Sequence, residues 1–299
     1  SIDSTGHMVS VSSAKYDDPI IFDKIFDFIN IHWYAYTSIE QYTTKLASYS
    51  IMYNKPVLAS EMGVSWEENT VNETILHQQI WSCAMGYTAG ASASWYWQEI
   101  DDIPDKAAYK QYKPLADYMS RIGLSNKKYY SVSGVNIGIT SEDIKALGYR
   151  SDNSAYIWIY DSKYNYLSSS FETYDSSKIK VKLEEGNYTV EWTNTWTGES
   201  LSKEDVTHSK GNLEITVPAW SKDIAVAILV EEAGTGSSVA VPMAKEIFDF
   251  YDKTVLKSYN LDKNMQYQLN ILGSLDVFTR QHCENVATIV CNLCHKLRL

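Results

Sequence analysis

The first 125 residues alternate short apolar runs with longer segments whose apolar residues recur at helical spacing. The runs at residues 7–12, 26–33, 56–61 and 91–97 predict strands, and the segments 39–53, 72–85 and 109–122 predict helices. Strands that alternate with helices in this way form parallel sheets, because right-handed crossovers place successive strands side by side. The pattern therefore predicts an α/β fold in which the C-terminal ends of the strands share one rim.

The length of this region limits which α/β fold it can complete. A (β/α)8 barrel takes about 250 residues for eight units, so residues 1–125 have room for about four of them. We therefore predict half of a barrel, with the catalytic groups at the C-terminal strand ends, where barrel enzymes place them. An open half-barrel exposes strand edges, and we expect these edges to favour self-association.

The pattern changes after residue 128. Residues 129–232 contain short alternating strands, among them 156–160 and 179–183, separated by turn residues. Gly186, Gly198 and Gly211 stand at hairpin-like positions, and together these features predict an all-β sandwich. We expect the aromatic residue before its last strand, Trp220, to belong to the core.

Two further segments complete the chain. Residues 233–241 have the composition of a flexible linker, and residues 242–299 show the apolar periodicity of a short helical tail. The stretch Cys291-Asn292-Leu293-Cys294-His295 matches the pattern of c-type haem attachment. It lies in an ordinary amphipathic pattern, so we favour packing cysteines and expect no cofactor and no metal.

Composition narrows the class of partner. The net charge of −11 disfavours a nucleic-acid partner, because phosphate binding needs a concentrated positive field, and we expect none. The longest apolar run, residues 224–230, is far shorter than a bilayer span, so we expect no membrane partner. Nine tryptophans and 23 tyrosines are many for 299 residues. Flat amphipathic rings suit sugar faces as well as protein cores, which makes carbohydrate a reasonable ligand class.

The candidate site lies at three neighbouring strand ends. Glu61 ends a buried strand, while His32 and Tyr34 end the preceding one and point the same way because side chains alternate along a strand. A phenol and an imidazole can orient a carboxylate for attack. Trp95 and Trp97 share a face of the next strand and can form a stacking floor for a sugar ring. The alternative is that Glu61 and His32 are structural residues.

These motifs, in this order, resemble the second half of family 5-like glycoside hydrolases, the relatives of cellulases and mannanases. The resemblance rests on residues 6–9, on the His32–Tyr34 pair, on residues 55–63 and on residues 94–97. It implies that residues 1–125 are strands 5 to 8 of a (β/α)8 barrel. It also implies that Glu61 is the nucleophile of a retaining mechanism, that His32 and Tyr34 bind substrate, and that Trp97, and less clearly Trp95, contacts the sugar.

The same resemblance implies an extracellular enzyme that acts on a β-linked polysaccharide or oligosaccharide. Its acid/base carboxylate belongs to the fourth strand, which would precede Ser1, so this chain alone is expected to be inactive. Other acidic residues near the rim match no family position, and we treat them as loop or substrate-contacting residues: Glu67, Glu68, Glu99, Asp101 and Asp102.

The last residues carry a second resemblance. Residues 275–299 resemble the start of an HD-type phosphohydrolase domain, in which His282 would match the first metal-ligand histidine. The remaining ligands of that family would follow Leu299. An HD module acts in the cytoplasm, which conflicts with an extracellular glycosidase. The alternatives are therefore a non-catalytic carbohydrate-binding fragment and a fused fragment of an HD-type signalling phosphohydrolase.

Overall fold

A computed structural model describes most of the chain up to residue 230. The described residues are 6–15, 17–34, 39–63, 73–92, 94–95, 107–124 and 128–230. The chain divides into two compact units, Ser1–Val230 and Glu231–Leu299, and every described residue belongs to the first. The predicted linker and helical tail, with His282 and the cysteine–histidine motif, lie outside the described residues. The fold of the described part is mixed α/β.

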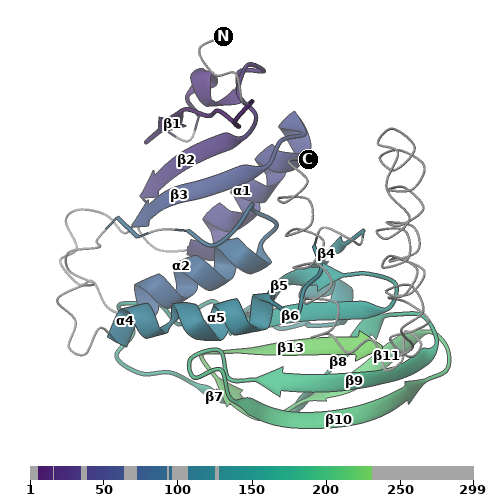
Figure 1. Cartoon of the computed structure of the whole chain (residues 1–299). Coiled ribbons are helices and arrows are strands. Elements are labelled where there is room, and N and C mark those ends of the chain that lie inside the picture. Colours follow the sequence, from purple (N-terminus) through teal and green to yellow (C-terminus); the bar gives the residue numbers. More distant parts are fainter. Residues whose placement is uncertain are drawn as a thin grey trace, which may run out of the picture. The chain divides into compact units, whose positions relative to one another are not determined.

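A small parallel sheet forms the N-terminal part of this unit (Figure 1). Strands β1 (Ser12–Ser13), β2 (Ile29–Tyr34) and β3 (Val57–Gly63) lie in the order β1-β2-β3, and both pairs are parallel. Ser94 extends the order through a parallel bridge to Met62. The predicted parallel order is thus confirmed, although the strand predicted at 7–12 is reduced to a short β1 that begins at Ser12.

Helices cover one face of this sheet. They are α1 (Ile39–Tyr53) and α2 (Glu73–Met85), with the short η1 (Pro19–Phe22) before β2. The inward residues of β2 and β3 pack in one cluster with Leu46 of α1 and Cys83 of α2. Cys83 is a free, buried cysteine, and burial raises the pKa of its thiol to about 11. It is therefore a core residue rather than a reactive one.

The second part of the unit contains two short helices and a larger antiparallel sheet. The helices are α4 (Ala107–Lys110) and α5 (Tyr112–Met119). The sheet has six strands in the order β10-β9-β13-β6-β5-β4. They are β4 (Tyr130–Ser133), β5 (Ile144–Arg150), β6 (Ser154–Asp161), β9 (Gly186–Thr193), β10 (Ser200–His208) and β13 (Asp223–Val230).

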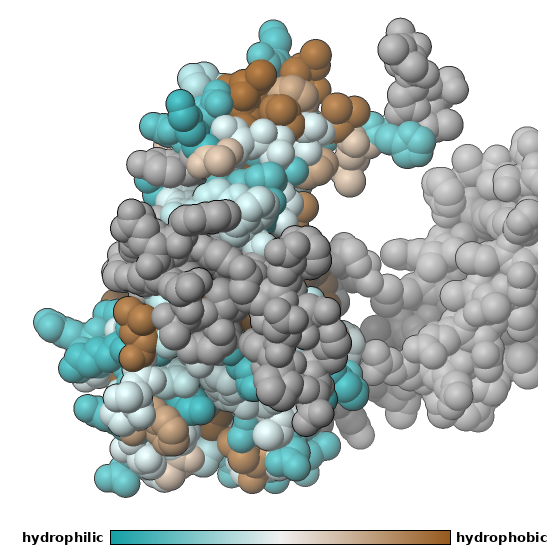
Figure 2. Space-filling model, turned by 90° about the vertical axis from the view of Figure 1, so that its left-hand side faces the viewer, coloured by the Kyte–Doolittle hydropathy of each residue, from teal (hydrophilic) through white to brown (hydrophobic). Residues whose placement is uncertain are grey.

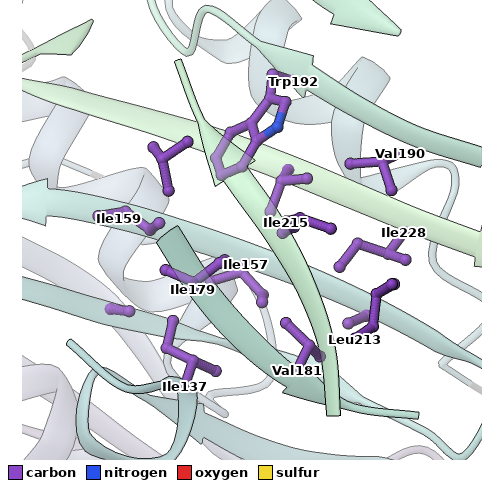
Figure 3. Packing of buried hydrophobic residues seen from close by; sticks show 14 of the residues in the cluster. Ile137, Ile157, Ile159, Ile179, Val181, Val190, Trp192, Leu213, Ile215 and Ile228 are labelled. Carbon is purple, nitrogen blue, oxygen red and sulfur yellow. The ribbon is translucent and has the colours of Figure 1, made fainter. Parts of the chain in front are cut away.

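Two further strand pairs accompany the six-stranded sheet. Strand β8 (Ser177–Lys182) pairs with β11 (Asn212–Val217), and β7 (Thr173–Tyr174) pairs with β12 (Trp220–Ser221). The short η3 (Val135–Ile137) follows β4. Isoleucine, valine and leucine side chains of β8 and β11 interdigitate with those of the larger sheet (Figure 3). The predicted core role of Trp220 is confirmed, because this residue is buried in the same cluster and stacks on Tyr174.

Strand β6, in the middle of the large sheet, is buried on both of its faces. All eight of its residues are buried. Ile157 and Ile159 face the layer of β8 and β11, whereas Tyr156, Trp158 and Tyr160 pack against α2 and α5. The alternation in the sequence is therefore one between aliphatic and aromatic residues, each set filling a different core. Figure 1 shows the helices above the six-stranded sheet.

Two of the three predicted hairpin glycines have another role. Gly198 lies between β9 and β10, which pair with each other, and its positive φ of 78° suits a glycine in this turn. Gly186 and Gly211 instead stand where the chain passes between strands of different sheets, since β9 and β10 pair together while β8 pairs with β11. The hairpin prediction is wrong at these two positions because turn residues do not reveal which strands pair.

Large apolar side chains are exposed near the small parallel sheet. Figure 2 shows hydrophobic residues gathered at the upper end of the molecule, the end that carries β1 in Figure 1. The exposed apolar residues of the N-terminal segment include Met8, Val9, Ile20, Ile25, Ile51 and Met52. The self-association that the sequence predicts, through open strand edges, stays a prediction.

Candidate active site

The candidate site depends on an irregularity in β3. Ile31 pairs with Ala59, but the next residue, His32, pairs with Glu61, so that Ser60 is an extra residue in the β3 strand. Such a bulge reverses the alternation of faces beyond it. Ser60 and Glu61 are both partly exposed, and Met62 turns back to the buried face. The bulge thus keeps the Glu61 carboxylate out of the apolar cluster beneath the helices.

Two side chains of β2 reach this carboxylate. The hydroxyl of Tyr34 donates a hydrogen bond to Glu61 Oε1, and His32 Nδ1 lies 3.5 Å from Glu61 Oε2. His32 and Tyr34 stand on the same face of β2, which alternates buried and partly exposed residues along its whole length. The structure therefore brings together the three residues that the sequence placed at neighbouring strand ends. Each oxygen of the carboxylate has its own neighbour.

The site remains open to solvent. The side chains of His32 and Glu61 are 27% and 20% exposed, respectively. A carboxylate that is held from both sides and still accessible can meet an incoming ligand, whereas a fully buried pair cannot.

An aromatic residue adjoins the site from the next segment. The ring of Trp95 lies 5.9 Å from that of Tyr34 in an edge-to-face arrangement, and the indole is 38% exposed. Its backbone N–H donates to the carbonyl of Met62, which anchors the segment to β3. Trp95 is thus placed beside the carboxylate. Trp97 lies outside the described residues, as do the rim acids Glu67, Glu68, Glu99, Asp101 and Asp102.

A second polar cluster, which no sequence motif indicated, is built around buried residues. His77 of α2 lies with Nε2 3.0 Å from Asp223 Oδ1 and with Nδ1 2.8 Å from Gln111 Oε1. Both ring nitrogens therefore face oxygen atoms, an arrangement that a doubly protonated ring satisfies. Thr195 and Trp158 donate to Asp223 as well.

The environment of Asp223 favours its ionised form. Burial on its own raises the pKa of this carboxyl group, but the charge and hydrogen bond of His77 and the hydrogen bonds from Thr195 and Trp158 bring the pKa below its ordinary value. Trp196 Nε1 also donates to Asp223 Oδ2, at 3.1 Å. Because the side chains of His77 and Asp223 are almost completely buried, we interpret this cluster as a structural network rather than a second active site.

Within the described ranges, no group of three or more histidine, cysteine, aspartate and glutamate side chains is arranged to hold a metal ion. None of the helices in the same ranges is long and apolar enough to cross a membrane.

Known proteins resemble this chain in structure rather than in sequence. No protein-family model and no curated protein matches it. Among solved structures it is similar to a glycoside hydrolase with 13% identity and a TM-score of 0.45, over 70% of this chain and 53% of the other. A family 5 glycoside hydrolase from Bacteroides vulgatus ATCC 8482 has 11% identity and a TM-score of 0.45, over 70% and 51%.

A family 30 subfamily 8 xylanase from Clostridium acetobutylicum is also similar, with 14% identity and a TM-score of 0.42, over 72% of this chain and 52% of the other. The chain thus spans about half the length of each of these three proteins.

Proposed function

We propose that Glu61 is the nucleophile of a retaining glycoside hydrolase that acts on a β-linked polysaccharide. The observation that carries this proposal is the position of the carboxylate, which is partly exposed and is contacted by Tyr34 on one oxygen and approached by His32 on the other. A nucleophile that is already held in one orientation loses less conformational entropy when it reaches its reactive geometry.

The reaction would proceed in two displacements. The Glu61 carboxylate attacks the anomeric carbon while the bond from that carbon to the leaving-group oxygen breaks, and a second carboxylic acid protonates this oxygen. Water then attacks the same carbon and gives its proton to the second carboxylate, and Glu61 departs as a carboxylate. In this scheme the hydroxyl of Tyr34 holds Glu61 in place, and His32 orients it and contacts substrate.

Aromatic residues would hold the sugar. Trp95 is exposed beside Tyr34 and offers an apolar surface for a pyranose ring. We also keep Trp97 as a candidate for the stacking floor, on the strength of its match to the eighth-strand tryptophan of the resembled family. A polymeric β-glycan is too large for a cell to take up intact, so this function would place the enzyme outside the cell.

The architecture proposed with this function has two parts. Residues 1–125 would be strands 5 to 8 of a (β/α)8 barrel, which the parallel order β1-β2-β3 and the Ser94 bridge support. Residues 129–232 would be an ancillary β-sandwich, which the layer of β8 and β11 on the six-stranded sheet supports.

The assay must supply the second carboxylate. A retaining enzyme holds its acid/base about 5 to 5.5 Å from the nucleophile, and the family resemblance assigns that role to no residue of this chain. We would fuse the chain behind strands 1 to 4 of a barrel glycosidase that carries its acid/base glutamate, and measure hydrolysis of β-glucan and β-mannan. The unfused chain should show no turnover.

The nucleophile is tested within that fusion. Glu61→Ala should lower kcat by about a thousandfold or more, and sodium azide should restore cleavage with a glycosyl azide of inverted configuration as the product. Asp117→Asn, which alters an exposed carboxylate paired with Lys113 on α5, should leave activity unchanged. Undiminished hydrolysis by the Glu61→Ala fusion, or turnover by the chain alone, would contradict the proposal.

A further inference from the structure

A pocket lies in the β-rich part of the molecule, on residues that the Glu61 site does not use. Its volume is about 380 Å³, within the range of about 300 to 1,000 Å³ that small-molecule sites occupy. It is formed where β7 and β12 meet the turn between β9 and β10 and the start of β13. Its lining includes Phe171, Asn194, Trp196, Trp220, Lys222 and Asp223.

The position of Lys222 is unusual. It connects β12 to β13 with a φ of 64°, a left-handed conformation that residues with a Cβ atom rarely adopt. Glycine would suit this backbone conformation better. The presence of a lysine here therefore indicates a function for its side chain. Its ammonium lies 4.5 Å from the ring centre of Trp196, 4.7 Å from that of Phe171 and 5.5 Å from that of Tyr164.

The positive charge in this pocket is not neutralised by an ion pair. In the described part of the chain, no carboxylate lies within ion-pair distance of the Lys222 ammonium. The adjacent acid, Asp223, is instead engaged with His77, Thr195 and the two indoles. An ammonium that lies over aromatic rings and has no carboxylate partner can form a charge-assisted hydrogen bond with an anionic group.

The Trp196 side of the pocket is held in place by its own contacts. The indole of Trp196 donates to Asp223, and its ring stacks on His77 with the ring centres 4.0 Å apart. Asn194 Oδ1 accepts the backbone N–H groups of Trp196 and Thr197, which holds the turn that carries the indole. Phe171, which is 52% exposed, presents its ring at the rim. A rigid site of this kind loses little entropy on binding.

We propose that this pocket binds a sugar acid, a uronic acid residue of a glycan, separately from the Glu61 site. The carboxylate of the uronic acid would form a charge-assisted hydrogen bond with the Lys222 ammonium. The apolar face of its pyranose ring would pack on Phe171, since aromatic rings provide a flat apolar surface. The inference is independent of the proposed catalytic role of Glu61.

The test uses the whole chain and two ligands that differ at one carbon. Sodium D-glucuronate and D-glucose are titrated while tryptophan fluorescence and calorimetry are recorded. Glucuronate should bind with a Kd on the order of 1 mM, and glucose should bind at least about tenfold more weakly because it lacks the carboxylate. Sodium acetate, which has the charge without the ring, should be weaker than glucuronate by a similar factor.

Variants of the protein test whether glucuronate binds in this pocket. Lys222→Gln should weaken glucuronate binding by about tenfold, Lys222→Arg should retain the preference over glucose, and Lys180→Gln, at an exposed lysine of β8, should have no effect. Near-ultraviolet circular dichroism confirms that each variant keeps the native fold. Glu61→Gln should bind glucuronate like the wild type, which separates this pocket from the catalytic proposal.

Several results would overturn the assignment. They are equal affinities for glucuronate and glucose, equal affinities for glucuronate and acetate, and no saturation up to about 100 mM glucuronate. Wild-type affinity in a natively folded Lys222→Gln variant, or loss of binding in Glu61→Gln, would do the same, because either places the sugar acid elsewhere.

Discussion

The imidazole of His77 and the carboxylate of Asp223 lie 3.0 Å apart although 146 residues separate them in the chain. The pair joins α2, which covers the small parallel sheet, to β13 in the centre of the six-stranded sheet. Both side chains are almost completely buried. A second histidine–carboxylate pair, His32 and Glu61, is longer and partly exposed. The two pairs therefore differ in what each is expected to contribute to stability.

We predict that His77→Ala lowers the free energy of unfolding by about 3 to 5 kcal/mol, because it leaves the Asp223 carboxylate buried without its charged partner. His32→Ala is the matched control and should cost less than about 1 kcal/mol, since solvent screens the partly exposed pair. Urea denaturation followed by circular dichroism measures both values. Similar losses for the two variants would show that burial does not distinguish the pairs.

The lowered pKa of Asp223 predicts a pH dependence. A carboxyl group whose pKa is lower in the folded than in the unfolded protein stabilises the fold above its unfolded pKa, and this contribution is lost as the pH falls through the folded pKa. The ordinary value is 3.8, so the loss should begin near that pH and continue below it. Urea midpoints measured from neutral to acidic pH should show this loss in the wild type and a smaller one in Asp223→Asn. Parallel curves for the two proteins would contradict the prediction.

Tyr118 connects α5 to the centre of the large sheet through one hydroxyl group. This hydroxyl donates to the carbonyl of Val226 at 2.5 Å and accepts from the N–H of Ile157 at 3.1 Å. Val226 and Ile157 are partners in the pairing of β13 with β6. Tyr118→Phe should destabilise the protein by about 1 to 3 kcal/mol, because two buried backbone groups lose a partner.

The control for Tyr118 is Tyr130→Phe, since Tyr130 is 41% exposed and should change the unfolding free energy by less than about 0.5 kcal/mol. Burial also raises the pKa of Tyr118 well above its ordinary value. Its phenol should therefore remain un-ionised during a spectrophotometric alkaline titration until the protein unfolds. Early ionisation in a folded protein would show that the hydroxyl is accessible.

Gly148 of β5 lies too close to β6 for any side chain. A Cβ atom at this position would be 2.1 Å from the carbonyl oxygen of Tyr156. This steric clash is with the backbone, so it can be removed only if one of the two strands moves. Gly148→Ala should cost at least about 3 kcal/mol or prevent folding. Gly123→Ala is the control, because nothing lies within 4 Å of its Cβ position. Thermal unfolding of both variants gives the comparison, and equal midpoints would be inconsistent with the close packing of β5 on β6.

Much of the local structure could be predicted because hydrophobic periodicity is a local signal. The helix predicted at 39–53 has those bounds in the structure, and the strand predicted at 56–61 is found as Val57–Gly63. The alternation of His32 and Tyr34 on one strand likewise placed them on one face. The proximity of both residues to Glu61 followed from parallel strand order, a rule that holds across α/β folds.

Other features could not be predicted, since they depend on contacts between distant residues. Strand pairing decided that Gly186 and Gly211 connect different sheets, which no turn residue specifies. Nothing near His77 in the sequence indicated a buried partner at Asp223. The pocket around Lys222 is equally non-local, because the rings near its ammonium come from two distant segments, the connection between β6 and β7 and the turn between β9 and β10.

By itself, the sequence determined most of the segments that form helices and strands and which residues stand at the ends of β2 and β3, because these properties depend on neighbours in the chain. Only the tertiary structure decided the one-residue bulge at Ser60 that turns Glu61 toward His32 and Tyr34. The physical reason is burial: regular pairing would direct the carboxylate into the apolar layer beneath the helices, where an unpaired charge is costly. The extra residue in β3 instead leaves Met62 in the core and Glu61 accessible.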